Sequence, residues 1–136
     1  MNNPGLLYAL DTNTLIYFFK GLGQVAENLL SHPPADIAIP TLVVYEIETG
    51  LAKSNQSRTR RQQFDQLLQA VNVLPFDLDA ARAAAKLRAQ LEKSGTPIGP
   101  LDTLIAGVAI ARRATLITHN TRELSRINEL QLADWF

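Results

Sequence analysis

The sequence predicts an α/β protein whose central parallel sheet, of four or five strands, is covered by helices on both faces. Two observations support this fold class. Short apolar runs alternate along the chain with longer segments whose apolar residues recur every three or four positions. Strands buried on both faces appear as continuous apolar runs, and the helices between them allow parallel connections. We therefore expect a three-layer domain.

The first half of the chain is predicted to contain two strands and three helices. The expected elements are a strand over 6–10, a helix through the apolar residues 15–19, a helix over 25–30, a strand over 37–39 and a helix over 41–52. Asp11 and the polar residues after it can cap the first helix, and Thr41 can cap the third. Pro33 ends the second helix, and Pro40 closes the second strand.

The second half is predicted to begin with an amphipathic helix, since Phe64, Leu67, Leu68 and Val71 follow its spacing. The expected elements are a helix from the polar stretch 57–63 onward, a strand over 71–76, an alanine-rich helix capped by Asp79 and ending before Gly95, a helix from Gly99 and Pro100, a strand over 116–118, a short helix and a last strand around 131–133. Pro100 suits a first helical position, where a missing N–H costs nothing.

Length and composition bound the class of protein. The 136 residues suit one domain over 1–136. The absence of cysteine excludes disulfide scaffolds, thiolate zinc sites and cysteine nucleophiles, and it fits a reducing cytoplasm. No signal-peptide pattern is present, and no apolar run approaches the roughly 20 residues of a membrane span. We expect a soluble cytoplasmic protein.

Acidic and amide side chains follow the predicted strands. Asp11 comes directly after the first strand, Glu46 lies in the helix after the second, and Asp102 lies in the first turn of the helix after Gly99. Four polar residues follow the fourth strand: Thr118, His119, Asn120 and Glu123. Alone, Asp11 and Asp102 could complement a helix N-terminus, and the glutamates could be solvated. Because ligands bind at the carboxyl ends of parallel strands, their convergence from four segments predicts a site.

Converging carboxylates repel one another, and a divalent cation relieves that repulsion. Ligands that are all oxygen favour Mg²⁺ or Mn²⁺ over zinc, and such an ion suits the hydrolysis of a phosphodiester. His119 could also touch a phosphate. Asp11 and Asn13 stand where aspartyl-phosphate phosphatases carry two aspartates, but an asparagine cannot act as acid and base. A small phosphatase is therefore a distant alternative.

These motifs resemble those of the PIN-domain ribonucleases and, more narrowly, of the VapC toxins of bacterial toxin–antitoxin pairs. The matching stretches are 10–13, Glu46 with Gly50, 99–106 and 118–124. Residues 93–100 and 132–135 are similar to the branch that cleaves initiator tRNA. The resemblance implies a central parallel sheet, a Mg²⁺ or Mn²⁺ cofactor and endonucleolytic cleavage of RNA.

The resemblance also implies roles for individual residues. Asp11, Glu46 and Asp102 match the metal-binding acids of the family, and Asn13 and Thr118 match its polar supports. For the fourth acid two positions stay open. Many PIN domains carry an aspartate where this chain has Asn120, whereas VapC-like members use the acid that matches Glu123. His119 departs from the asparagine or basic residue common at its position.

Charge and apolar patterning suggest partners. Basic residues cluster at Arg58, Arg60 and Arg61, and an acidic centre bordered by basic residues suits a nuclease. Residues 15–19 are apolar on every side of their predicted helix. Core packing accounts for about half of that circumference, and the remainder suggests a surface for a second copy or an antitoxin peptide. The resemblance implies both a VapB-like antitoxin and a homodimer. A catalytically silent RNA- or protein-binding module of the same fold is the alternative, against which the intact acids argue.

Overall fold

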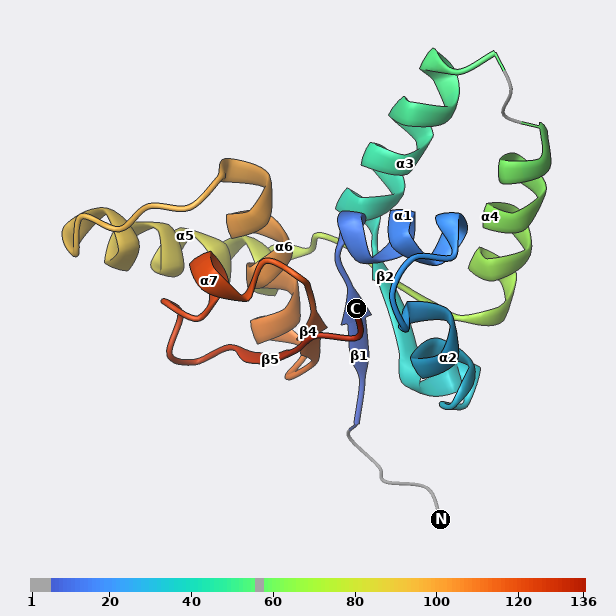
Figure 1. Ribbon diagram of the computed structural model, residues 1–136. Helices are drawn as coiled ribbons and strands as arrows, with labels where there is room; N and C mark the ends of the chain where they lie inside the picture. Colours follow the sequence, from blue (N-terminus) through green and yellow to red (C-terminus); the bar gives the residue numbers. More distant parts are fainter. Residues whose placement is uncertain (1–5, 56–57) are drawn as a thin grey trace.

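The computed structural model describes residues 6–55 and 58–136, which build one five-stranded parallel sheet (Figure 1). Its strand order is β3-β2-β1-β4-β5. The strands are β1 (Tyr8–Leu10), β2 (Ile37–Pro40), β3 (Asn72–Leu74), β4 (Thr115–Ile117) and β5 (Gln131–Ala133). The predicted α/β class and parallel sheet are confirmed, with five strands.

The order of the strands places a switch in direction at β1. The chain adds β2 and β3 on one side of β1 and then returns to add β4 and β5 on the other. Ala9 in β1 is accordingly in register with Ala38 in β2 and with Leu116 in β4. Because ligands of open parallel sheets bind at such a switch point, the carboxyl ends of β1 and β4 define the edge of interest.

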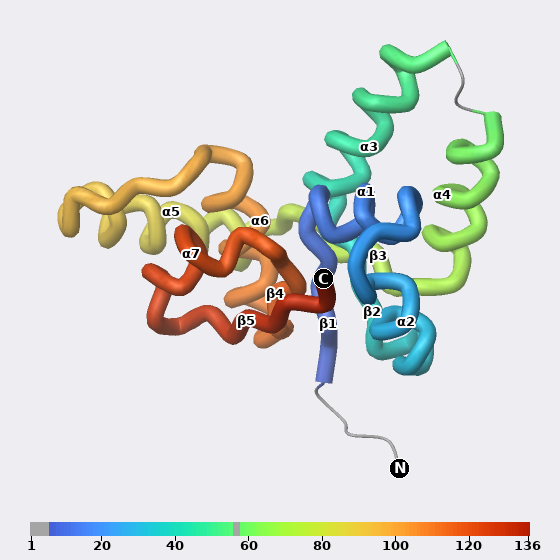
Figure 2. Tube along the Cα trace, in the orientation of Figure 1, coloured from blue at the N-terminus to red at the C-terminus, as the bar shows by residue number. Residues whose placement is uncertain are grey.

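The helices flank this sheet in two groups (Figures 1 and 2). The helices are α1 (Thr12–Lys20), α2 (Val25–Leu30), α3 (Thr41–Lys53), α4 (Arg58–Ala70), α5 (Leu78–Lys93), α6 (Pro100–Ala111) and α7 (Thr121–Leu124), with a 3₁₀ turn over Pro34–Asp36. In both views α5, α6 and α7 lie on the β4–β5 side, while α3 and α4 rise as a pair on the other side. No helix of the described part of the chain has the length and apolar character needed to cross a membrane.

Two predicted helix caps are wrong by one or two residues. Pro40 occupies the cap position of α3, and Thr41 is its first helical residue, with no side-chain cap. At α5 the cap is Asp77, whose Oδ1 accepts a hydrogen bond from the Ala80 amide at 3.0 Å, while Asp79 lies exposed in the first turn. The backbone is still extended at Pro40 and at Asp77, so each helix begins at the next residue. The sequence does not show where the backbone changes from extended to helical.

Four of the predicted strands have other limits in the structure. The first strand begins at Tyr8 instead of residue 6, and the second ends at Pro40 instead of residue 39. The strand expected over 71–76 is limited to Asn72–Leu74, because only these residues pair with β2. The fourth strand begins at Thr115 and ends at Ile117, one residue before its predicted limit. Ser57, at the start of the predicted amphipathic helix, lies outside the described residues.

Close packing of α5 on α6 explains the alanine-rich sequence of α5. A Cβ added at Gly107 in α6 would lie 2.6 Å from the Cβ of Ala84 in α5. The two helices therefore touch nearly backbone to backbone, which larger side chains would prevent. This contact anchors α6, whose first turn carries Asp102 at the edge of the sheet.

Candidate active site

Asp11 is held at the carboxyl end of β1 by contacts to α1 and β4. Its amide donates to the carbonyl of Ile117 at 3.1 Å, and its Oδ1 accepts from the amide of Thr14 at 2.9 Å. The hydroxyl of Thr14 donates to the same Ile117 carbonyl at 3.0 Å. Both side chains are buried. Thr14 is one of the expected capping residues, and its buried hydroxyl also fastens α1 to the end of β4.

Glu46 reaches the start of α1 from the second turn of α3. The hydroxyl of Thr12 donates to Glu46 Oε1 in a short hydrogen bond. Thr12 is the residue after Asp11, so this bond brings the ends of two distant segments together. Thr12 is not among the predicted site residues. The signal that could have found it is a hydroxyl residue directly after an acid that ends a strand.

The carboxyl group of Asp102 lies within the electrostatic reach of the other three acids. Asp102 is the third residue of α6 and is half-buried. Burial raises the pKa of its carboxyl, and the negative charges of Asp11, Glu123 and Glu46 raise that pKa further. The charges of Asp11, Glu46 and Glu123 therefore act on Asp102 across the same edge of the sheet.

The segment after β4 carries its own hydrogen-bonded support. Thr118 is fully buried, its amide donates to Ala133 at 3.0 Å, and its hydroxyl accepts from the amide of Asn120 at 3.0 Å. The side-chain amide of Asn120 then donates to Glu123 Oε2 at 3.2 Å. Asn120 therefore contacts Glu123 directly. Asn13, by contrast, is exposed at the second position of α1.

His119 is fixed by residues that follow β5. Its Nδ1 lies 2.8 Å from Oδ2 of Asp134, and its ring stacks on Phe136 with centroids 4.4 Å apart. Tyr17 of α1 approaches the same ring edge-on. The other histidine, His32, makes contacts near the opposite end of β1, which the functional-site prediction does not use.

The arrangement of the acids suits a cation but does not amount to a preformed coordination shell. Within residues 6–55 and 58–136, no three histidine, aspartate or glutamate side chains already lie close enough to hold a metal ion. The available donors are nonetheless carboxylate oxygens, and three of them raise the pKa of the fourth. A divalent cation that prefers oxygen ligands fits this set, because it relieves the repulsion.

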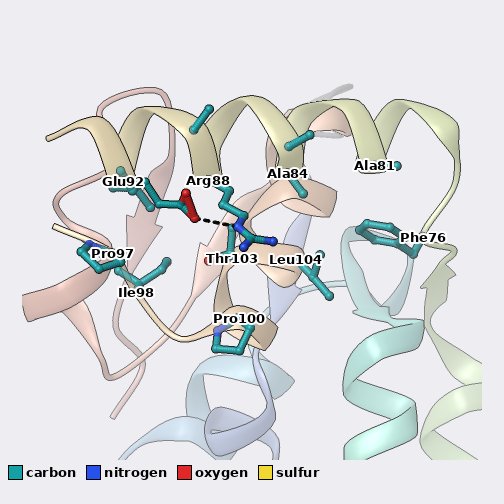
Figure 3. Close-up of a pocket in the computed structure, with 13 residues that line it drawn as sticks. Phe76, Ala81, Ala84, Arg88, Glu92, Pro97, Ile98, Pro100, Thr103 and Leu104 are labelled. Carbon is teal, nitrogen blue, oxygen red and sulfur yellow. Dashed lines mark hydrogen bonds and ion pairs between the residues drawn. The ribbon is translucent and has the colours of Figure 1, made fainter. Parts of the chain in front are cut away.

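Two cavities lie near the acids. One of about 330 Å³ lies between α1, α3 and α4 and includes Glu46. Another of about 710 Å³ lies between α5 and α6, lined by apolar residues and by the Arg88–Glu92 ion pair (Figure 3). The residues lining this second cavity, all in the described part of the chain, include none of the four acids. Of the four acids, Glu46 therefore lines the smaller cavity, and none lines the larger one.

The apolar stretch 15–19 is partly taken up by packing within the fold. Leu15 is fully buried, and the four residues after it are half-buried. The ring of Phe19 contacts Phe64 edge-on, and the guanidinium of Arg60 lies 4.7 Å from the Phe19 centroid. As expected, core packing therefore uses part of this apolar stretch and leaves part of it accessible. Of its half-buried residues, Ile16 and Phe19 line the cavity between α1, α3 and α4.

The predicted basic cluster is also partly used within the fold. Arg61 donates to Glu48 of α3 in a short ion pair, which lowers the pKa of that carboxyl. Arg60 covers Phe19, and Arg58 is exposed. These contacts join α4 to α3 and α1, so only part of the cluster is available to a nucleic acid.

Comparison with known families agrees with this geometry. A model of the PIN domain matches residues 8–130, nearly the whole described chain. The chain belongs to the PIN-domain family. The resemblance drawn from the sequence is thereby confirmed, and the parallel sheet with acids at its carboxyl edge is the PIN fold.

Within the PIN-domain family the chain is similar to VapC proteins. It is 33% identical to ribonuclease VapC2 of Rickettsia felis and 30% identical to the tRNA(fMet)-specific endonuclease VapC of Shigella flexneri, covering 96% of this chain and 98% of each relative. Among solved structures, DNA-bound VapBC of Salmonella typhimurium matches with a TM-score of 0.88 at 30% identity, over 96% of this chain and 99% of that one. VapBC2 of Rickettsia felis, bound to a promoter DNA fragment, matches with a TM-score of 0.87.

Proposed function

We propose that this chain is the toxin of a toxin–antitoxin pair and a metal-dependent endoribonuclease that hydrolyses phosphodiester bonds in RNA. The observation that carries the proposal is the placement of the four acids at the carboxyl edge of the sheet. Asp11 caps α1 after β1, Glu46 bonds to Thr12 beside it, and Asp102 and Glu123 lie in the first turns of α6 and α7. The charges of the other three acids raise the pKa of the Asp102 carboxyl, which agrees with this placement. The names of the VapC relatives support RNA as substrate, and initiator tRNA is the first substrate to test. A cytoplasmic location follows from such a substrate.

In this proposal Asp11, Glu46, Asp102 and Glu123 hold the cation, Mg²⁺ or Mn²⁺. When bound, such an ion lowers the pKa of an attacking water and neutralises charge that develops on the phosphate oxygens. Asn13, Thr118 and Asn120 serve as polar supports. The whole chain, 1–136, acts as a single nuclease domain.

Neighbouring residues orient the carboxylates. The amide of Thr14 occupies Oδ1 of Asp11, so the other oxygen of that buried carboxylate is left for a ligand. In the same way, the Thr12 hydroxyl donates to one carboxylate oxygen of Glu46, and the Asn120 side chain donates to one of Glu123. Asp102 retains its proton more readily than an ordinary aspartate, so cation binding has to compete with that proton.

We further propose that an antitoxin segment occupies the cavity between α1, α3 and α4. Its apolar residues, including Ile16 and Phe19, suit a peptide side chain, and Glu46 lies in the same cavity. An arginine of the inhibitor could pair with the carboxylates in bidentate geometry and compete with the cation. The VapBC assemblies among the structural relatives support such a partner. Homodimer formation is proposed on the family resemblance.

The experiment is RNA cleavage by the purified protein with Mg²⁺ or Mn²⁺ and with EDTA, comparing the wild type with D11N and D102N. Asp79→Asn is the matched control, because Asp79 also lies in the first turn of a helix but is exposed on α5. We expect cleavage only with metal, its loss in D11N and D102N, and full activity in D79N. Sequencing the new 5′ ends of cellular RNA after induction identifies the substrate.

Three results would contradict the proposal. Full cleavage by purified D102N would refute the site. RNA binding without cleavage in either metal would favour the catalytically silent module, and turnover of small phosphomonoesters would favour a phosphatase.

A further inference from the structure

We propose that His119 contacts the ribose–phosphate backbone of RNA bound at the acidic edge, and that Asp134 is a positioning residue that orients the imidazole. The inference rests on the proposed ribonuclease function. It concerns a site made by the segment after β4 and the residues after β5.

The hydrogen bonds of Asp134 determine which nitrogen of His119 is available. Oδ2 of Asp134 lies 2.8 Å from His119 Nδ1, and Oδ1 accepts from the amide of Phe136 at 2.9 Å. Because an ionised carboxylate only accepts hydrogen bonds, the proton in the first contact belongs to Nδ1. Nε2 is thus the nitrogen left for a ligand.

The orientation of the imidazole is set by three contacts. Besides Asp134, the ring of Phe136 stacks at an interplanar angle of 26°, and Tyr17 packs edge-on with centroids 5.9 Å apart. The His119 side chain is nevertheless 47% exposed. A ring that is both held and accessible is preorganised for binding, because little rotamer entropy remains to be lost.

The position of His119 places this ring beside the proposed site. His119 lies between Thr118 and Asn120, the residues whose hydrogen bonds lead to Glu123. Tyr17 belongs to α1, the helix that begins directly after Asp11. The ring and the acids thus belong to segments that leave the same edge of the sheet, after β1 and β4.

The chemistry of Nε2 selects the ligand. In the neutral ring with its proton on Nδ1, Nε2 accepts a hydrogen bond from a ribose 2′-hydroxyl. In the doubly protonated ring, Nε2–H donates to a phosphate oxygen. Both groups belong to the RNA backbone, so the shared ligand is the ribose–phosphate unit.

The test measures binding of fluorescently labelled unfractionated tRNA to the full chain carrying D102N, which keeps the RNA uncut. We expect H119A and D134A each to weaken binding by about tenfold, and the double variant to bind no more weakly than H119A, because Asp134 acts through His119. D134N, which keeps an accepting oxygen, should fall between D134A and the parent. A labelled oligonucleotide and its 2′-deoxy counterpart then distinguish a hydroxyl contact, lost with the hydroxyl, from a phosphate contact.

His32 provides the matched control. Its ring also stacks on a residue near the end of the chain, Trp135, at 5.0 Å, and its Nδ1 lies 2.8 Å from a backbone carbonyl. Because it contacts Tyr8 at the start of β1, away from the acids, H32A should bind RNA like the parent. Circular dichroism of each variant confirms folding, and H119Q replaces H119A if the latter unfolds.

Several outcomes would overturn the inference. Parental RNA affinity in folded H119A and H119Q refutes it, as does additivity of the two alanine substitutions. A higher Mg²⁺ requirement for cleavage by H119A, with RNA binding unchanged, would show that the ring merely supports the Glu123 segment. If the wild type fails to cleave RNA but H119A, D134A and the double variant bind RNA as expected, the proposed activity alone is refuted. If the parent does not bind RNA, both the proposed activity and this inference are refuted.

Discussion

Replacing Asp102 with asparagine should stabilise the metal-free protein. In the folded chain the pKa of the Asp102 carboxyl is raised above its ordinary value of 3.8, because burial and three neighbouring acids disfavour its charged form. Such a group binds its proton more tightly in the folded state than in the unfolded chain. The stability of the metal-free protein therefore falls as the pH rises from 3.8 through the raised folded pKa, and the deficit persists above it.

The size of the gain follows from the like charges that asparagine removes. Each repulsive pair at a half-exposed site costs about 0.2–0.5 kcal/mol, so the three pairs with Asp11, Glu46 and Glu123 together cost about 1 kcal/mol. For a chain of 136 residues this corresponds to a rise in Tm of roughly 4 °C. Mg²⁺ reduces this difference in stability, because it stabilises the wild type more than D102N. At about ten times its Kd it stabilises the wild type by about 1.4 kcal/mol and the variant by less.

The assay is thermal unfolding of the wild type and D102N at pH 7 in EDTA and in Mg²⁺, repeated in EDTA near pH 3.5. D79N is the control, since exposed Asp79 faces no such cluster. We expect D102N to melt higher in EDTA at pH 7, to lose that advantage at pH 3.5 and to respond weakly to Mg²⁺. A lower Tm for D102N in EDTA at pH 7 would refute the electrostatic reasoning.

Three further predictions concern the fourth acid, the helix packing and the partner surface. E123Q should raise the Mg²⁺ concentration for half-maximal cleavage more than N120A does, because a carboxylate is an anionic ligand and Asn120 only donates to it; the reverse order in a metal titration would reassign the fourth ligand. G107A should lower the free energy of unfolding by about 1–3 kcal/mol in a denaturant titration, because the added methyl meets Ala84; an unchanged midpoint would contradict the packing. F18E should weaken co-purification of the antitoxin encoded next to the gene, since half-buried Phe18 packs on Phe19, which lines the proposed antitoxin cavity; full affinity in a variant folded by circular dichroism would place the partner elsewhere.

Local patterns in the sequence were sufficient for the order of the elements. The apolar run before Asp11 and the spacing around Phe64 each predict the observed type of element, because burial of one helix stripe or of a whole strand leaves a periodic trace. Element boundaries were less certain. Asp77 caps α5 and Asp79 does not, because the cap is decided by where the backbone leaves its extended conformation.

The candidate site, too, was predictable from the sequence only in part. The sequence by itself determined which acids follow which strands, and parallel topology then brings the carboxyl ends of those strands to one edge. Only the tertiary structure decided that the charges of Asp11, Glu46 and Glu123 act on Asp102. Electrostatic coupling depends on distance and burial, which residue types and their spacing along the chain do not specify.

The supporting contacts depended on the tertiary structure most of all. Thr12 meets Glu46, and His119 meets Asp134, only because residues far apart in the chain end at the same edge of the sheet. A hydroxyl or carboxylate carries no local signal for such a partner, since its hydrogen bond is equally possible with water. The sequence therefore determined the class of fold and the acids available to it, whereas three-dimensional packing decided which side chains hold them in place.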